Sequence, residues 1–167
     1  MIMKAHKIVS DDKYLKTSCV PCRTLEEGEQ IANMLKATLA ANRDGVGLAA
    51  NQIGINKSVC LISVKKLIVL INPKIVGKYD KFIYREGCLS YPGQSVMTER
   101  YKNIVVMADN HKDLLKFSCD SPQDMLECVC VQHEIDHLNG ITMHMRIPTL
   151  ATPKATDLLI SAIKDNK

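Results

Sequence analysis

The stretch that decides how this chain is organised is Gln132-His133-Glu134-Ile135-Asp136-His137-Leu138-Asn139-Gly140. His133 and His137 are four residues apart, so on a helix of about 3.6 residues per turn their side chains lie roughly 40° apart and can reach one metal ion. Glu134 lies one step round the helix, close enough to handle a proton. Apolar residues flank the stretch and predict a buried helix, on which two histidines and two carboxylates would be costly without a metal or other partners. We therefore predict a metal site here.

The segments around this stretch predict an α+β fold. Ser121 as N-cap and Pro122 in the first turn start the central helix, and Asn139-Gly140 ends it. A second helix is expected over 24–42, opened by a capping box of Thr24 and Glu27. β-branched and apolar runs predict strands within 58–76, 79–85, 97–108 and 114–119, and a short C-terminal helix is expected from Thr152-Pro153. We expect short, mostly antiparallel strands around the central HExxH helix, with a capped N-terminal helix and a short C-terminal helix.

Length and composition indicate one domain over residues 1–167, without repeats or linkers. Hydrophobic residues make up 46% and charged residues 24%, which excludes a disordered chain. The net charge of +4 is mild and aromatic residues are only 4%, so direct nucleic-acid readout is not expected. No apolar run is long enough for a membrane span and no signal-peptide pattern opens the chain. Seven cysteines, an odd number, favour reduced thiols and a cytoplasmic protein.

The pattern HExxH does not say where a third metal ligand lies. One class of metalloproteases, the metzincins, continues as HExxHxxGxxH, and Gly140 fits that pattern. The third histidine position is Met143, however, and His144 comes one residue late. Cys88 is the other candidate, because it follows a predicted strand in a turn bracketed by glycines, and a thiolate binds a borderline divalent metal strongly. The metzincin-like protease remains the second hypothesis.

Other features have blander interpretations. The segment 45–54, GVGLAANQIG, is a flexible glycine-rich loop when taken alone; it lacks the Lys-Ser/Thr of a P-loop and follows a helix, which argues against nucleotide binding. Cys19 and Cys22 form a CxxC that could be a redox centre or half of a zinc site, but no second CxxC exists and no βαβ pattern precedes it. We expect ordinary surface or core cysteines there, and small buried hydrophobes at Cys60 and Cys119. A non-catalytic binding module would be expected to lack Glu134 or Gln52, and both are present.

Three segments, in this order, resemble the peptide deformylase family: GVGLAANQ (45–52), EGCLS (86–90) and QHEIDHLNG (132–140) match GxGLAAxQ, EGCLS and QHExxHLxG. The resemblance implies a metal-dependent hydrolase that removes the N-formyl group from the N-terminal methionine of newly made polypeptides and releases formate. It makes Cys88, His133 and His137 the metal ligands. A metal-bound water attacks the formyl carbon, with Glu134 as general acid/base. The Gln52 amide and the Leu89 backbone N–H stabilise the charge on the formyl oxygen.

The same resemblance implies how a peptide binds. The backbone at Val46, Gly47 and Gly87 forms an edge to which the substrate adds as a strand, and a pocket for the methionine side chain is lined by Tyr84, Leu126, Val129, Cys130 and His133. Leu126 and Val129 could instead be plain core. Arg100 matches a position near the peptide-binding rim, with a solvated surface arginine as the alternative. The family departs from this chain in a longer segment at 64–67, in Ile or Val at the place of Tyr91, and in a longer C-terminal helix.

A Cys-His-His ligand set by itself would suggest zinc. The resemblance implies one divalent ion, with Fe²⁺ as the native metal and Zn²⁺, Ni²⁺ or Co²⁺ as replacements. It also implies formyl-methionyl nascent peptides as partners, met near the ribosome exit. We expect a monomer without nucleic-acid or membrane contacts, acting in the cytoplasm of a bacterium, or of its host if the chain is viral, with an organelle as the alternative.

Overall fold

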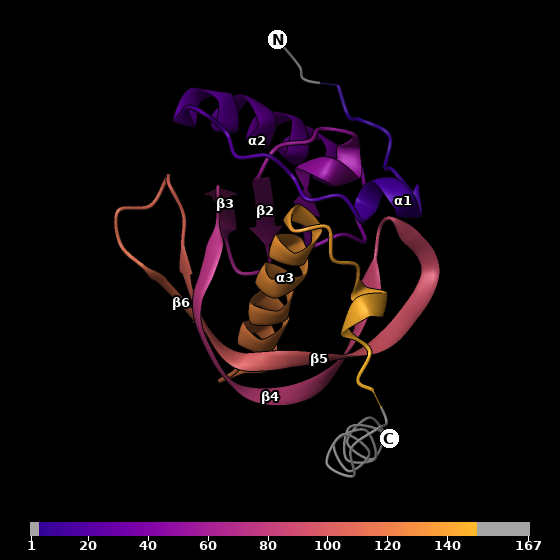
Figure 1. Cartoon of the computed structure of the whole chain (residues 1–167), viewed down its shortest axis with the longest axis vertical. Helices are drawn as coiled ribbons and strands as arrows, with labels where there is room; N and C mark the ends of the chain where they lie inside the picture. The colour runs from indigo at the N-terminus through magenta and orange to yellow at the C-terminus, as the bar shows by residue number, and fades with distance from the viewer. Residues whose placement is uncertain (1–3, 150–167) are drawn as a thin grey trace.

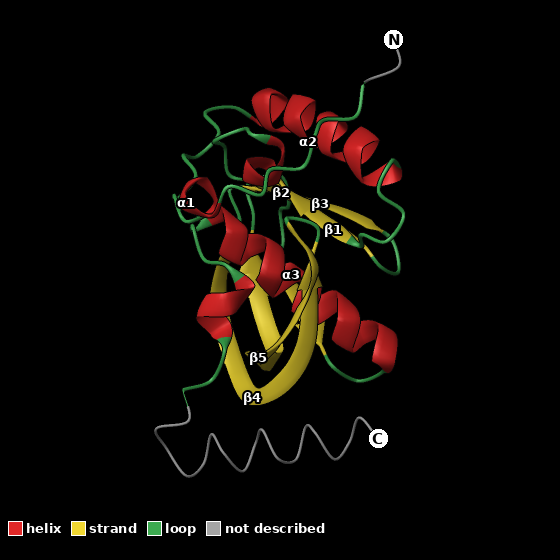
Figure 2. Ribbon diagram, turned by 90° about the vertical axis from the view of Figure 1, so that its right-hand side faces the viewer, coloured by secondary structure: helices red, strands yellow, loops and turns green. Residues whose placement is uncertain are grey.

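Two three-stranded sheets hold a helix between them in this computed structural model, which describes residues 4–149 (Figures 1 and 2). The first sheet has the order β1-β2-β3, formed by Gly47–Ala49, Val59–Ser63 and Leu67–Ile71. The second has the order β4-β5-β6, formed by Lys74–Cys88, Tyr91–Met107 and Leu115–Ser118. All strand pairs within the sheets are antiparallel. The predicted α+β class with antiparallel strands is confirmed.

β4 and β5 are much longer than expected, at 15 and 17 residues. The expectation of short strands is wrong for this pair, because pairing continues through two register shifts, between Ile75 and Gly77 and between Gly87 and Cys88. Such bulges bend a strand without ending the ladder, and the hairpin curves strongly in Figure 1. The bend carries the end of β4, and with it Cys88, back toward the helix.

The helix between the sheets, α3, spans Pro122–Leu138. The Ser121 hydroxyl accepts from the Asp124 backbone N–H at 3.1 Å, and Gly140 follows the helix with a φ of 69°. A Cβ at Gly140 would lie 2.6 Å from the Lys16 carbonyl oxygen, so only glycine fits this turn. Every residue from 127 to 138 is buried, because both sheets pack against the helix. Its polar side chains therefore need partners inside the protein.

A second long helix, α2 (Leu25–Ala40), covers the sheet β1-β2-β3 (Figure 2). Thr24 accepts from the Glu27 N–H at 3.1 Å, while the Glu27 carboxylate accepts from the Arg23 N–H at 2.8 Å, so the expected box is shifted by one residue. The apolar side of α2 packs on strand residues of that sheet; the shared cluster includes Ile31, Leu35, Leu39, Leu48, Leu61 and Ile71. The short helix α1 (Asp12–Leu15) was not predicted.

The segment 45–54 is not a flexible loop, which corrects the expectation for it. It forms β1 and then a short 3₁₀ helix, η1 (Ala50–Ile53), and its residues from 47 to 53 are buried. A second 3₁₀ turn, η2 (Met143–Arg146), follows α3. The helix expected from Thr152 lies outside the described residues.

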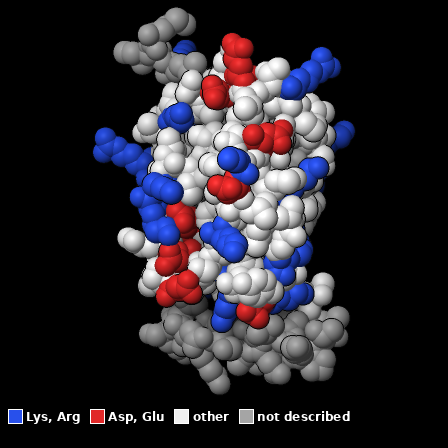
Figure 3. Space-filling view, turned by 90° about the vertical axis from the view of Figure 1, so that its left-hand side faces the viewer, with Lys and Arg blue, Asp and Glu red and all other residues white. Residues whose placement is uncertain are grey.

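The surface in Figure 3 has Lys and Arg side chains interspersed with Asp and Glu, without a block of one sign on that face. This distribution fits the mild net charge of +4. Within residues 4–149, no helix combines the length and the apolar character needed to cross a membrane.

Candidate metal centre

The side chains of Cys88, His133 and His137 meet at the inner end of β4. The Cys88 Sγ lies 3.3 Å from the His137 Nε2, which lies 3.1 Å from the His133 Nε2. All three candidate donor atoms lie within 4.8 Å of one another, and no other such group of three occurs among residues 4–149. Burial lowers the pKa of His137 well below its usual value, whereas at His133 the effect of burial is outweighed by hydrogen bonds with Cys88 and Glu86, which raise its pKa well above the usual value. One thiolate and two imidazoles suit a borderline divalent ion.

The histidine that a metzincin-like site would need does not join this group. Met143 is 1% exposed and packs in a small cluster with Leu15 and Tyr91. His144 instead places its Nε2 2.9 Å from the Gln94 Oε1, at an exposed position. The structure therefore gives the metzincin-like arrangement no third ligand among the described residues.

Glu86 binds the Nδ1 of His133, whereas the Nε2 of that ring faces the other candidate metal donors; the sequence analysis assigned Glu86 no role. Its carboxylate accepts from the His133 Nδ1 at 2.8 Å and from the Arg100 Nε and Nη2 at 2.6 and 2.9 Å. Burial by itself would raise the pKa of Glu86, but hydrogen bonds from His133 and Arg100 and their charges lower it to about 2. A carboxylate that holds the second nitrogen of a metal-ligating histidine fixes the ring and its tautomer. The sequence did contain a signal for this role: Glu86 lies two residues before Cys88 on a predicted strand, and residues two apart on a strand share a face.

Arg100 is only 2% exposed, so it is neither a rim residue nor a solvated arginine as expected. Besides Glu86 it donates to Asp136 at 2.5 Å, and Arg146 donates to the same Asp136 at 2.6 and 2.8 Å. The two buried carboxylates are thereby paired with guanidinium groups on β5 and η2. This network fixes α3 against the second sheet at the level of the histidines.

Glu134 lies inside the protein beside the metal-ligand cluster, 3% exposed, and its Oε2 has no hydrogen-bond partner among the described residues. Burial raises the pKa of Glu134 to about 7, opposed by the positive charge of His133 and helped by the negative charge of Glu86. Gly47 allows this approach: a Cβ there would lie 2.5 Å from the Cys130 Sγ and 2.7 Å from the Glu134 Oε1. A carboxyl with a free oxygen and a pKa near neutrality can accept and return a proton.

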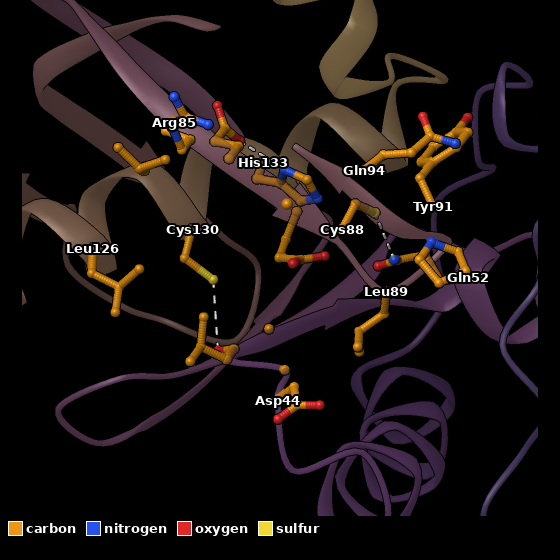
Figure 4. A pocket seen from close by; sticks show the side chains of 18 of the residues that line it. Asp44, Gln52, Arg85, Cys88, Leu89, Tyr91, Gln94, Leu126, Cys130 and His133 are labelled. Atoms are coloured by element: carbon orange, nitrogen blue, oxygen red, sulfur yellow. Dashed lines mark hydrogen bonds and ion pairs between the residues drawn. The ribbon is translucent and has the colours of Figure 1, made fainter. Parts of the chain in front are cut away.

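Gln52 points its amide at the cluster from η1 (Figure 4). Its Oε1 accepts from the Ala49 N–H at 2.9 Å, which leaves the Nε2 to face the Ser90 Oγ at 3.2 Å and the Cys88 Sγ at 3.5 Å. Leu89, the residue after Cys88, places its side chain against Gly45, where a Cβ would lie 2.7 Å from the Leu89 Cδ1. The hydrogen-bond donor of Gln52 therefore lies beside Cys88.

A cleft of about 540 Å³ opens beside the cluster (Figure 4). His137 lies behind it, 1% exposed, and a Cβ at Gly87 would make only an ordinary contact, 3.6 Å from the Gln94 carbonyl oxygen. The cleft is lined by all the other predicted site residues, namely Val46, Gly47, Gln52, Tyr84, Gly87, Cys88, Leu89, Leu126, Val129, Cys130, His133 and Glu134. The roles of these residues stay predictions, but the structure places all of them in the wall of one cleft. Asp44, Arg85 and Gln94 also line it and were not predicted.

The cysteines other than Cys88 and Cys130 do not line this cleft. All seven are free thiols, with Cys19 and Cys119 half-buried and Cys22 and Cys60 buried. Cys119 is therefore more exposed than expected. A second and larger cleft, of about 890 Å³, is lined by β3 and β6 and by four lysines, and contains no group of three metal donors within the described part of the chain.

Comparison with known proteins places these features in a family. The family model described as "Polypeptide deformylase" matches residues 5–152. A curated peptide deformylase of Chromobacterium violaceum is 35% identical over 95 residues, which are 57% of this chain and 55% of that protein. The chain spans about half the length of the curated relatives it matches, or less.

Solved structures agree with the family model over most of the chain. The peptide deformylase of Ehrlichia chaffeensis in complex with actinonin is 26% identical, with a TM-score of 0.78 and 99% of both chains covered. The Met-Ala-Ser-bound class I type b peptide deformylase of Acinetobacter baumannii is 27% identical, with a TM-score of 0.72, and covers 88% of this chain and 100% of that one. With its fold, its cleft and three motif segments around one group of metal donors, this chain belongs to the peptide deformylase family.

Proposed function

We propose that this protein is a metal-dependent amide hydrolase that removes the formyl group from formyl-methionyl peptides and releases formate. The observation that carries the proposal is the buried Glu134, whose carboxylate has one free oxygen beside the donor atoms of Cys88, His133 and His137. An acid/base group next to a three-donor metal cluster at the inner end of a cleft is an arrangement suited to metal-assisted hydrolysis of an amide. The Met-Ala-Ser bound to the Acinetobacter baumannii relative supports a methionyl peptide as the ligand.

Cys88, His133 and His137 would hold the metal, with Glu86 orienting His133. When bound, a divalent ion supplies Lewis acidity to the formyl group and lowers the pKa of a water at the site. We propose Fe²⁺ as the native ion, following the family resemblance, with Zn²⁺, Ni²⁺ or Co²⁺ as replacements.

Glu134 moves the proton in this mechanism. One carboxylate oxygen takes a proton from the attacking water and delivers it to the leaving α-amine nitrogen, and a pKa raised to about 7 by burial suits both steps. Charge grows on the formyl oxygen as the water attacks. The Gln52 Nε2 and the Leu89 backbone N–H donate to that oxygen, and Gln52 is held in place through its Oε1 by Ala49.

The peptide adds as a strand between the backbone at Val46 and Gly47 and the end of β4 at Gly87. Its methionine side chain enters the pocket lined by Tyr84, Leu126, Val129 and Cys130. The substrate would be a nascent chain met near the ribosome exit in the cytoplasm, and we propose that the protein acts as a monomer.

Comparing three substrates with the same metal-loaded protein, prepared without oxygen, tests this function. Formyl-Met-Ala-Ser should release formate, whereas acetyl-Met-Ala-Ser and an unmodified protein should be cut far more slowly. The extra methyl group meets the reacting centre, close to Leu89, so the formyl preference should exceed the roughly 10- to 200-fold typical of one methylene in a hydrophobic pocket. Equal formyl and acetyl rates, or efficient internal proteolysis, would contradict the proposal.

The choice of iron has a separate test. Activity of protein from native expression should decay in air and persist under argon, because ferrous iron and its thiolate ligand are both open to oxidation. Equal half-lives in air and argon, together with zinc found by metal analysis, would rule iron out.

A further inference from the structure

We propose that Arg85 selects the residue that follows the substrate's methionine and favours an acidic side chain there. The inference rests on the proposed deformylase function and adds a substrate class to it. It starts from a cation in the wall of the cleft that the protein itself leaves without a counter-charge.

Arg85 lies on β4, lines the cleft and is exposed. It makes no ion pair with a carboxylate of residues 4–149; its one side-chain contact is a long hydrogen bond of 3.5 Å from its Nη1 to the Ser95 Oγ. Two other cationic side chains on β4 and β5 do have carboxylate partners: Arg100 is paired with Glu86 and Asp136, and Lys81 is paired with Glu99 at 2.7 Å. Arg85 is therefore available to a ligand in the cleft.

Strand geometry places Arg85 on a particular side of the bound peptide. β4 is an edge strand of its sheet, so its free edge borders the cleft. Side chains alternate along a strand: Tyr84 and Glu86 face α3, whereas Arg85 and Gly87 face the opposite side. Glu86 is the buried member of this set and Arg85 an exposed one, in agreement with the alternation.

The same alternation applies to the substrate strand. With the formyl group at Cys88 and the methionine side chain in the inner pocket, the next side chain points outward. At about 3.3 Å per residue, that second residue lies level with Glu86 and Arg85. Its side chain therefore shares the outer side with the guanidinium group of Arg85.

The two nearby carboxylates do not cancel this charge. Glu86 is buried and paired with Arg100 and His133. Asp44 lines the same cleft, and Figure 4 draws it across the cleft from Arg85. An aspartate or glutamate after the methionine meets Arg85 first.

Three peptides measure the preference: formyl-Met-Asp-Ser, formyl-Met-Asn-Ser and formyl-Met-Lys-Ser. Attraction by one exposed ion pair and repulsion of a like charge should give the metal-loaded protein a kcat/KM about three- to tenfold higher for Asp than for Lys at low salt. The preference should shrink toward one at about 0.5 M salt, where exposed charges are screened. Arg85→Gln should bring the ratio near one, and Arg85→Glu should invert it.

Lys74→Glu is the matched control, because Lys74 is exposed on the same strand, does not line the cleft, and the change alters the net charge as Arg85→Glu does. It should keep the wild-type ratio. Competition by the product peptides Met-Asp-Ser and Met-Lys-Ser gives a readout that does not depend on turnover, and should show the same order of affinity. Formate release with equal kcat/KM for the three peptides, or a preference unchanged in Arg85→Glu, overturns this inference alone. Absence of formate release from every formylated peptide would remove the proposed function as well.

Discussion

Replacement of Glu86 by Gln removes one charge from the network behind His133 and keeps the shape of the side chain. The glutamine oxygen can still accept from the His133 Nδ1, but the NH2 group that replaces the second carboxylate oxygen cannot accept from the Arg100 Nε. Arg100 then remains buried with Asp136 as its only carboxylate partner. We expect a large loss of stability at neutral pH and weaker metal binding.

Two estimates of the loss agree. Removing one partner of a buried ion pair costs about 3–5 kcal/mol. The pKa of Glu86 falls from an ordinary 4.5 to about 2 in the folded protein, and at about 1.36 kcal/mol for each tenfold change in proton affinity this corresponds to about 3 kcal/mol. Because the folded pKa is the lower one, this stability is present above about pH 4.5 and is lost as the pH falls toward 2. At about pH 4 the wild type has already lost part of this stability, so the difference in the free energy of unfolding between wild type and variant should be smaller than at pH 7 by about 0.8 kcal/mol.

Urea unfolding of the metal-free proteins at pH 7 and pH 4 measures the loss of stability and its decrease at low pH. Metal titration measures the weaker metal binding, for which we expect a loss of about 10- to 100-fold in affinity. Glu99→Gln is the matched control, because Glu99 lies on β5 in a pair with Lys81 whose side chains are 31% and 51% exposed; it should cost less than about 1 kcal/mol. A Glu86→Gln protein within 1 kcal/mol of the wild type at pH 7, or a gap that does not narrow at pH 4, would refute the reasoning.

Three further predictions concern the site itself. Cys88→Ala should lose most of its bound metal by elemental analysis while Cys22→Ala keeps it, and full occupancy in Cys88→Ala would contradict the ligand assignment. Glu134→Gln should retain the metal but lose about 10²- to 10⁴-fold in kcat, as expected for a general acid/base; a variant as active as the wild type would exclude that role. Gly47→Ala should lower kcat/KM strongly, because its Cβ would lie 2.5 Å from the Cys130 Sγ and 2.7 Å from the Glu134 Oε1; unchanged kinetics would mean that β1 can move away at no cost.

Local signals account for the helices. Ser121 and Gly140 bound α3 because a hydroxyl can satisfy a free N–H at a helix start and a glycine can adopt positive φ after a helix end. The spacing of His133 and His137 brought their Nε2 atoms to 3.1 Å, which any α-helix permits. These features depend on residues within a turn or two, so they are legible without the fold.

The strands were harder to predict. β4 and β5 continue through bulges and through the segment 91–96, which contains a proline and a glycine and has no alternating pattern. Their length comes from pairing with each other, and pairing partners far apart in the chain leave no periodic signal in either strand. The segment 45–54 was misjudged for the same reason, because it is α2 and α3 that bury it.

The sequence by itself determined the bounds of α3, the shared face of its two histidines and, through three motif segments, the family. The meeting of Cys88 with His137, 49 residues apart, was implied by the family resemblance alone, whereas only the tertiary structure brought Glu86 to His133, 47 residues away. It also decided that Arg100 is buried between carboxylates while Arg85 stands free in the cleft, a difference that residue type cannot reveal. The physical reason is that helical periodicity and capping are local, whereas burial, charge pairing and the raised pKa of Glu134 arise from the low-dielectric interior that forms when both sheets close on α3.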